Sequence, residues 1–153
     1  MKVLLDTSVL VSAMLSDHVQ HAHSQPWLVQ ANAGAFDAVV SGHSLAELYA
    51  VLTRLPRTPR ITPVEALQLI QANVASRTVV TLSAHDYVKL IEELAQHGVA
   101  GGAVYDAVIA KAAELADVDL LLTLNVGHFQ RVWPSGASRV VSPVAMTPPR
   151  SNP

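Results

Sequence analysis

Short apolar runs alternate with longer segments of helical character along most of this 153-residue chain. The runs with the length and the apolar or β-branched residues of buried strands are 3–5, 36–40, 78–82, 120–124 and 139–141. Strands that alternate with helices are joined by right-handed crossovers, which makes their sheet parallel. We therefore expect an α/β fold with a central, mostly parallel sheet of four to five strands and helices on both faces.

Capping residues and prolines predict where the helices begin and end. Thr62 followed by Pro63 and Ser83 followed by Asp86 are typical helix starts, and Gly98 is typical of a helix end. Pro26 is expected in the first turn of a helix that begins near residue 24. The expected helices are 9–15, 24–33, 44–55, 63 onward, 84–96 and 103–116, with a short turn or helix at 126–132.

The chain has enough apolar material for one core, because 50% of its residues are hydrophobic. We expect one domain over residues 1–146 and a flexible, proline-rich tail over 147–153. Only 14% of the residues are charged, which favours an apolar interface such as that of a homodimer. The net charge of -2 is not that of a general nucleic-acid binder, so any such contact must be local or mediated by metal.

The N-terminus superficially resembles a signal peptide, with Lys2 before apolar residues, but Asp6, Thr7 and Ser8 interrupt that apolar run. No uninterrupted apolar stretch has the length needed to cross a bilayer. The sequence has no cysteine and hence no disulfide or thiolate site. We expect a cytoplasmic protein with no membrane partner.

Four polar residues lie in or directly after apolar stretches: Asp6, Glu47, Asp106 and Asn125. Burying an ionised carboxylate is costly unless a cation or hydrogen bonds compensate its charge. Asp6 and Asn125 follow predicted strands, and ligands of parallel sheets bind beyond the carboxyl ends of the strands. These residues therefore predict an acidic pocket at that edge of the sheet.

Each of these residues also has a purely structural explanation. Asp6 could cap the first helix, and Glu47 follows Ser44 at the spacing of a capping box. Asp106 at a helix N-terminus is stabilised by the macrodipole, and Asn125 could serve a turn. The structural explanations do not require the four side chains to gather in one place, whereas a metal site does.

Carboxylate oxygens are the ligands that Mg²⁺ and Mn²⁺ prefer, usually together with waters and a substrate phosphate. A divalent ion held in this way activates water and neutralises charge on a phosphate during displacement. The predicted chemistry is phosphodiester hydrolysis.

Four ordered motifs carry a family resemblance: Asp6-Thr7-Ser8, Ala46-Glu47-Leu48, Tyr105-Asp106-Ala107 and the segment LTLNVGHF at 122–129. Together they resemble the motifs of PIN-domain ribonucleases, in particular the VapC toxins of type II toxin-antitoxin systems. The likeness extends from residue 1 to about residue 144. It implies a single PIN-like domain.

The resemblance also implies roles for individual residues. It implies that Asp6, Glu47 and Asp106 bind metal directly or through water and that Asn125 completes the catalytic set. Thr7, Ser8 and Thr123 would support that set. The family implies Mg²⁺- or Mn²⁺-dependent endoribonuclease activity that leaves a 3′-hydroxyl and a 5′-phosphate, homodimers, and a cognate antitoxin that covers the active-site groove.

Asn125 departs from the family pattern, which often has aspartate there. A neutral amide oxygen binds a cation less strongly than a carboxylate. We therefore expect one tightly held ion, with a weaker or substrate-dependent second position.

Other polar residues are open to two interpretations. Arg54, Arg57 and Arg60 are candidates for RNA contact, although a solvated loop is the simpler interpretation. His18, His21 and His23 could bind zinc but are more typical of surface or packing positions. His128 could contact phosphate, but packing beside Phe129 is the favoured interpretation. Trp27 and Trp133 are expected in the core or an interface.

Two other functions compete with the nuclease. Phosphatases with an aspartyl nucleophile also begin with an aspartate after the first strand, but they generally have a second acid where this chain has Ser8. The second alternative is a catalytically weak PIN fold that binds RNA or a partner without cutting. Three retained acidic positions out of four favour activity.

Overall fold

The computed structural model of the protein describes residues 1–74 and 76–150. Its strands form one parallel sheet in the order β3-β2-β1-β4-β5. The strands are β1 (Lys2–Leu5), β2 (Asp37–Ser41), β3 (Thr78–Val80), β4 (Leu120–Leu122) and β5 (Val140–Val141). The predicted α/β fold with a mostly parallel sheet of four to five strands is confirmed.

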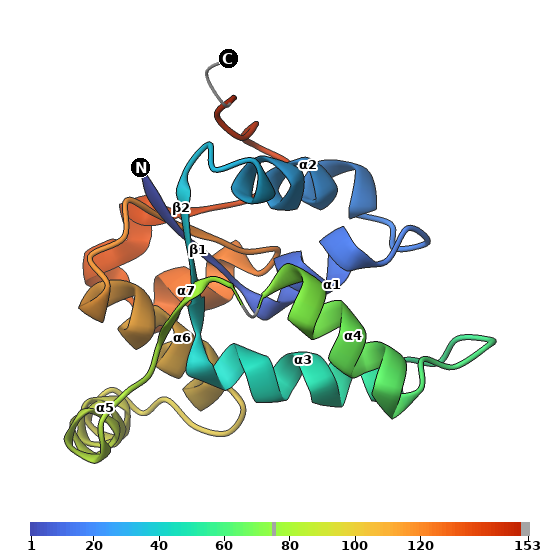
Figure 1. The fold of residues 1–153 in the computed structure, drawn as a ribbon. Coiled ribbons are helices and arrows are strands. Elements are labelled where there is room, and N and C mark those ends of the chain that lie inside the picture. Colours follow the sequence, from blue (N-terminus) through green and yellow to red (C-terminus); the bar gives the residue numbers. More distant parts are fainter. Residues whose placement is uncertain (75, 151–153) are drawn as a thin grey trace.

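Helices cover both faces of this sheet (Figure 1). They are α1 (Thr7–Met14), α2 (His21–Asn32), α3 (Gly42–Arg54), α4 (Pro63–Asn73), α5 (Ala84–Gln96), α6 (Ala103–Leu115), α7 (Val126–Val132) and the short 3-10 helix η1 (Pro134–Arg139). The core has a layer on each side because successive strand residues point to opposite faces. Val3 and Leu5 pack with the α1–α3 side, whereas Leu4 packs with Ile109 and Phe129 on the α6–α7 side.

Both tryptophans lie in these core layers, as predicted. Trp27 is fully buried and meets Phe36 edge to face, with ring centroids 5.7 Å apart. Trp133 is buried in the opposite layer with Phe129. Neither indole is accessible to a nucleobase.

The predicted caps of α4 and α5 are present. Thr62 accepts a hydrogen bond from the backbone N of Glu65 at 3.2 Å, and the Glu65 carboxylate accepts one from the N of Thr62 at 2.7 Å. Ser83 and Asp86 form the same reciprocal pair at the start of α5. Gly98 follows α5 with a φ of 65°, a conformation that favours glycine.

Three predicted helix starts were wrong. The first helix begins at Thr7 rather than at residue 9, directly after its cap Asp6. The second helix begins at His21 rather than near residue 24, so Pro26 lies inside it and not in its first turn. The proline is tolerated there because the buried Trp27 and Leu28 hold this helix in the core. The third helix begins at Gly42 rather than at Ser44, and Ser41 is its cap, accepting a hydrogen bond from the N of His43 at 3.2 Å.

The start of α3 lies very close to the segment after β3. A Cβ atom added at Gly42 would come within 2.5 Å of the Thr81 side-chain methyl carbon, so only glycine fits without displacement. The strands at 78–80 and 120–122 are each two residues shorter than predicted, because the chain leaves the sheet at Thr81 and at Thr123. Residues 147–150 have no regular structure, and 151–153 of the expected tail lie outside the described residues.

Candidate active site

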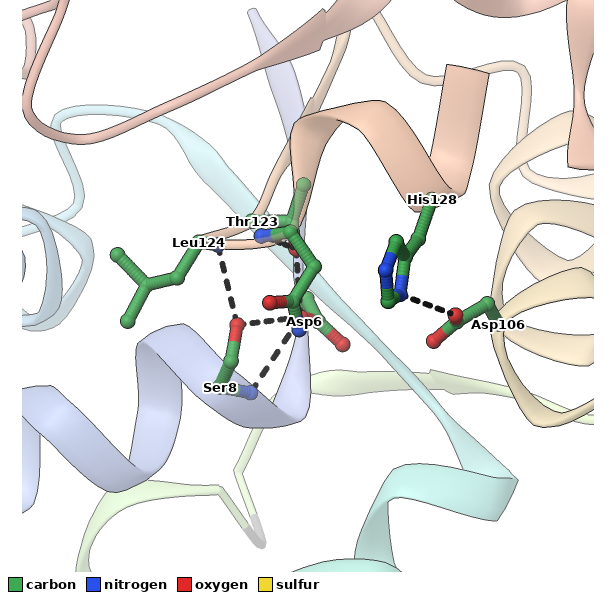
Figure 2. A network of polar contacts seen from close by, with 7 residues as sticks. Asp6, Ser8, Asp106, Thr123, Leu124 and His128 are labelled. Carbon is green, nitrogen blue, oxygen red and sulfur yellow. Dashed lines mark hydrogen bonds and ion pairs between the residues drawn. The ribbon is translucent and has the colours of Figure 1, made fainter. Parts of the chain in front are cut away.

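Asp6 is held at the carboxyl end of the central strand β1, where it caps α1. It is buried, with only 3% of its surface exposed. Its Oδ2 atom accepts hydrogen bonds from Ser8 Oγ at 2.5 Å and Thr123 Oγ1 at 2.7 Å, and a longer one from Ser8 N at 3.4 Å (Figure 2). No described residue donates to the other oxygen, Oδ1, which therefore keeps its capacity to accept a hydrogen bond or bind a cation.

The two hydroxyl groups that bind Asp6 are themselves fixed by backbone donors. Ser8 Oγ accepts from Leu124 N at 3.1 Å, and Thr123 Oγ1 accepts from Asn125 N at 3.0 Å. Because each hydroxyl has a single proton, accepting from the backbone directs that proton to the carboxylate. The loop after β4 and the start of α1 are thus joined through Asp6.

Glu47 lies in the second turn of α3 and reaches across to α1. Its Oε2 atom accepts a hydrogen bond from Thr7 Oγ1 at 2.6 Å, which links residues 40 positions apart. The capping-box explanation for Glu47 does not hold, because Ser41 rather than Ser44 caps this helix. Its other oxygen, Oε1, has no hydrogen bond from the described residues.

Asp106 lies in the first turn of α6 and is more open to solvent than Asp6. Its Oδ2 atom lies 3.5 Å from His128 Nδ1, and Figure 2 shows the imidazole turned toward the carboxylate. The side chain of His128 is 65% exposed, so the favoured prediction that it packs beside Phe129 was wrong. Adjacent helical residues point about 100° apart, and the buried Phe129 therefore leaves His128 directed outward.

Asn125 is exposed immediately before α7. It occupies the N-cap position, yet its side chain makes no capping hydrogen bond. Its backbone carbonyl accepts from the N of His128 at 3.0 Å and of Phe129 at 3.3 Å. The backbone forms the turn, so the amide side chain is not needed for it.

Burial and mutual repulsion alter the acidity of this group. The pKa of Asp6 is raised to about 6: desolvation is the largest cause, the hydrogen bonds from Ser8 and Thr123 act against it, and the charges of Glu47 and Asp106 add to the rise. The pKa of Asp106 is raised mainly by partial burial, against the lowering effect of His128. The three carboxylates are close enough to influence one another electrostatically.

The three carboxylates do not form a ready-made cage. Within residues 1–74 and 76–150, no three acidic or histidine side chains converge closely enough to hold a metal ion on their own. Mg²⁺ usually keeps several waters and uses one or two carboxylates, which fits carboxylates that each have one bonded and one free oxygen. Asp6, Glu47 and Asp106, with the amide of Asn125, could hold such an ion partly through water.

The arginine group lies away from the carboxylates. Arg57 Nη2 forms an ion pair with Asp17 at 3.2 Å, and Arg57 and Arg60 line a hollow beside Met14 at the far end of α1 from Asp6. An eight-residue helix is about 12 Å long. Arg54 is exposed at the end of α3. These residues could contact RNA only at some distance from the carboxylates.

The histidines near the start of α2 have other partners. His18 Nδ1 accepts from Gln20 N at 3.1 Å, and His21 Nδ1 lies 3.0 Å from the Ser12 carbonyl oxygen. No zinc-binding group is found among the described residues. Of the helices in the described part of the chain, none is both long and apolar enough to cross a bilayer.

Comparisons with known proteins identify the class to which this fold and site belong. Residues 3–132 match the PIN domain family, so the chain belongs to the PIN-domain family. It is 39% identical over 109 residues to Ribonuclease VapC27 of Mycobacterium tuberculosis, and this match covers 71% of this chain and 74% of that protein. It is also 39% identical over 116 residues to Ribonuclease VapC40 of the same species, covering 76% and 81%.

Solved structures share the fold at low sequence identity. VapBC2 from Rickettsia felis, bound to a DNA fragment from its promoter, has a TM-score of 0.63 at 20% identity and covers 93% of this chain and 98% of its own. VapC20 from Mycobacterium tuberculosis, a sarcin-ricin loop cleaving toxin, has a TM-score of 0.59 at 16% identity and covers 78% and 86%. The predicted PIN family, and its VapC branch in particular, is confirmed.

Proposed function

We propose that this protein is a metal-dependent endoribonuclease that acts as the toxin of a toxin-antitoxin pair. The observation that supports it most is the set of three carboxylates, from the end of β1, from α3 and from α6, whose charges act on one another. Asp6 and Glu47 each have one oxygen that accepts hydrogen bonds and one without a partner among the described residues, and Asp106 has one contact, at 3.5 Å, with His128. The relatives named as VapC ribonucleases support the choice of RNA as substrate.

The proposed reaction is hydrolysis of a phosphodiester bond. The oxygen of water bonds to phosphorus, the bond from phosphorus to the 3′ oxygen breaks, and a proton ends on that oxygen. The products are a 3′-hydroxyl and a 5′-phosphate. A bound Mg²⁺ or Mn²⁺ would activate the water and neutralise charge on the phosphate.

The protein's own residues position this chemistry. Ser8 and Thr123 fix Asp6 so that its free oxygen has one orientation, and Thr7 does the same for Glu47. Asn125 adds a neutral oxygen at the exposed side. We propose one tightly held ion in the absence of RNA, because Asn125 lacks the charge of an aspartate.

The proposed partners are a cognate antitoxin and a second copy of the chain, in the cytoplasm. Solved relatives in the fold comparison include VapBC2 and FitAB, each bound to DNA. The antitoxin would cover the carboxylate set and prevent RNA from reaching it. Arg54, Arg57 and Arg60 are proposed RNA contacts outside the carboxylate set.

The decisive experiment is cleavage of RNA by the purified protein. We expect cleavage in Mg²⁺ or Mn²⁺, none with EDTA, and none by the Asp6→Asn variant in either metal. Mapping 5′ ends in cells after brief induction would identify the RNA. Specific RNA binding by the wild type without cleavage in either metal would instead favour the catalytically weak binding module.

The contribution of the arginines is tested separately. Changing Arg60 to Gln should weaken RNA binding and reduce the slope of log affinity against log salt by about 1. If affinity and slope are both unchanged in all three single arginine variants, this loop does not contact phosphate.

A further inference from the structure

Two aromatic rings from different helices are stacked at the surface. The imidazole of His43, in the first turn of α3, and the phenol of Tyr105, in the first turn of α6, have centroids 5.1 Å apart and planes inclined by only 7°. Tyr105 is 54% exposed, whereas His43 is half-buried. Nearly parallel rings at this centroid distance are offset, so His43 covers part of one face of the phenol ring and leaves much of the ring exposed.

The aromatic pair is carried by the same helices as two of the proposed catalytic carboxylates, within about one turn of each. Tyr105 directly precedes Asp106 in α6, so their side chains leave neighbouring backbone positions about 100° apart around the helix. His43 precedes Glu47 by one helical turn, and residues with that spacing share one side of a helix. The two helices that carry the pair also contact each other directly. The stacked rings therefore connect the helices that supply two of the three carboxylates.

The local structure fixes the backbone that carries the His43 ring. Its backbone N donates to the Ser41 cap, and the neighbouring Gly42 packs so closely on Thr81 that no side chain would fit there. An aromatic ring backed in this way loses little conformational freedom when a ligand stacks on it.

An acidic site on a chain of net charge -2 attracts RNA weakly through charge. The basic group of Arg57 and Arg60 lies a helix length away. Stacking of a base on an aromatic ring provides affinity that does not depend on charge, about 1–3 kcal/mol per base. Single-stranded RNA presents unstacked bases to such rings.

We propose that the His43–Tyr105 pair is a stacking platform for one nucleobase of single-stranded RNA, next to the phosphate that is cut. This inference rests on the proposed ribonuclease function and adds the residues that hold the substrate. Tyr105 contacts the base, and His43 is a positioning residue that supports the phenol ring.

Binding is measured first, with a labelled pool of short, single-stranded RNAs of random sequence. The Asp6→Asn protein prevents cleavage during the measurement. Adding Tyr105→Ala should weaken binding by roughly 5- to 150-fold, whereas Tyr105→Phe, which keeps the ring, should bind like the parent. Tyr49→Ala is the matched control, because Tyr49 is a comparably exposed tyrosine of α3, at 43%, with no aromatic contact among the described residues.

The second measurement locates the base. Sequencing the products that the wild type makes from the same pool gives the preferred cut, and a matching RNA is then made with the base removed at each position beside it. At one position, removing the base and changing Tyr105 to Ala should each weaken binding. Combining the two changes should weaken binding no more than either change alone. His43→Ala should also weaken binding, by a smaller factor, and its effect should likewise not add to that of removing the base.

The outcomes separate this platform from the proposed activity. Equal binding by the Tyr105→Ala and parent proteins, with normal cleavage by the wild type, would refute the platform and leave the nuclease intact. The platform would also be refuted if, at every position, the losses of binding free energy from Tyr105→Ala and from base removal simply added. Tyr105-dependent, base-dependent binding by a wild type that cuts nothing would support the platform and overturn the nuclease.

Discussion

Asp6 and Asp106 are both acids of the proposed site, but the protein holds them in contrasting ways. Asp6 is buried and receives three hydrogen bonds on one oxygen from groups fixed by the backbone. Asp106 is half-buried and has one contact, at 3.5 Å, with an exposed histidine. The proposed site therefore has a rigid side formed with the fold and an open side exposed to solvent. Changes on the two sides should affect stability and activity differently.

The largest expected effect is on the rigid side. Asp6→Asn keeps one oxygen to accept from Ser8 and Thr123 but places an amide group where the free carboxylate oxygen was. Cleavage should fall at least about 100-fold. Loss of a residue that only hydrogen-bonds to a metal ligand lowers activity by up to about 100-fold, and Asp6 is itself a proposed ligand. The free energy of unfolding at neutral pH should stay the same or rise, because a desolvated charge is removed.

Asp106→Asn is the matched change on the open side. It should also abolish most cleavage, but with little change in unfolding free energy, because Asp106 is less desolvated than Asp6. Chemical denaturation and initial cleavage rates measure the two quantities. A stability loss in the Asp6 variant larger than in the Asp106 variant would show that the hydrogen bonds of Asp6 outweigh its desolvation, and would reverse this comparison.

The second prediction concerns pH. The pKa of Asp6 is raised from 3.8 to about 6 on folding, so the folded state binds this proton more tightly than the unfolded state. Its protonation therefore favours folding; stability is lost as pH rises from about 4, and the full cost, about 3 kcal/mol, is reached above pH 6. Asp6→Asn removes this contribution at every pH.

The pH effect is measured as the difference in unfolding free energy between the wild type and Asp6→Asn, without divalent metal. Taking this difference removes the contributions of other acids, such as Asp86 and Glu65, whose pKa values are lowered by their capping contacts. The unfolding free energy of the variant should increase relative to that of the wild type as the pH rises from about 4 to about 7. A difference that is constant across this range would mean that Asp6 titrates normally.

The third prediction tests the link between α1 and the loop after β4. Thr123→Val removes a donor to Asp6 and leaves the backbone N of Asn125 without its acceptor. The protein should lose about 1–3 kcal/mol of stability, and cleavage should fall about 10- to 100-fold as the Asp6 carboxylate loses its fixed orientation.

Thr123→Ser is the control, because it keeps the hydroxyl and removes only a methyl group. It should recover most of the activity. If the valine and serine variants are equally active, the hydroxyl of Thr123 does not orient Asp6 for the reaction.

Most of the fold could be predicted from the sequence because its signals are local. A buried parallel strand is a short apolar run, and the Thr62–Glu65 and Ser83–Asp86 caps lie within four residues of chain. The start of α3 could not be predicted in this way. Its glycine is needed only because Thr81, nearly 40 positions later, packs on the backbone there.

The same limit applies to the site. Asp6 and Asn125 could be assigned to one sheet edge because both follow strands, but which oxygen of each acid remains free depends on distant partners. Thr7 reaches Glu47 and Thr123 reaches Asp6 across 40 and 117 positions. No periodicity in the sequence indicates the stacking of His43 on Tyr105. Their roles in catalysis and binding stay predictions.

The smallest effect is expected from His128, on the open side. Its ring is exposed and only 3.5 Å from Asp106, and such surface pairs contribute at most about 1 kcal/mol. His128→Ala should therefore leave the unfolding free energy nearly unchanged and lower cleavage by no more than about fivefold. Any loss should be greatest at low pH, because the positive charge of His128 lowers the pKa of Asp106 and its removal lets that pKa rise.

Cleavage rates of the wild type, His128→Ala and His128→Gln across pH measure this effect. The glutamine variant keeps a polar side chain without a titrating charge, so a loss shared by both variants assigns the effect to charge. A loss from His128→Ala as large as that from Asp106→Asn at every pH would contradict the division into rigid and open sides. The imidazole would then contribute to cleavage as much as a carboxylate of the proposed site, although its side chain is exposed to solvent.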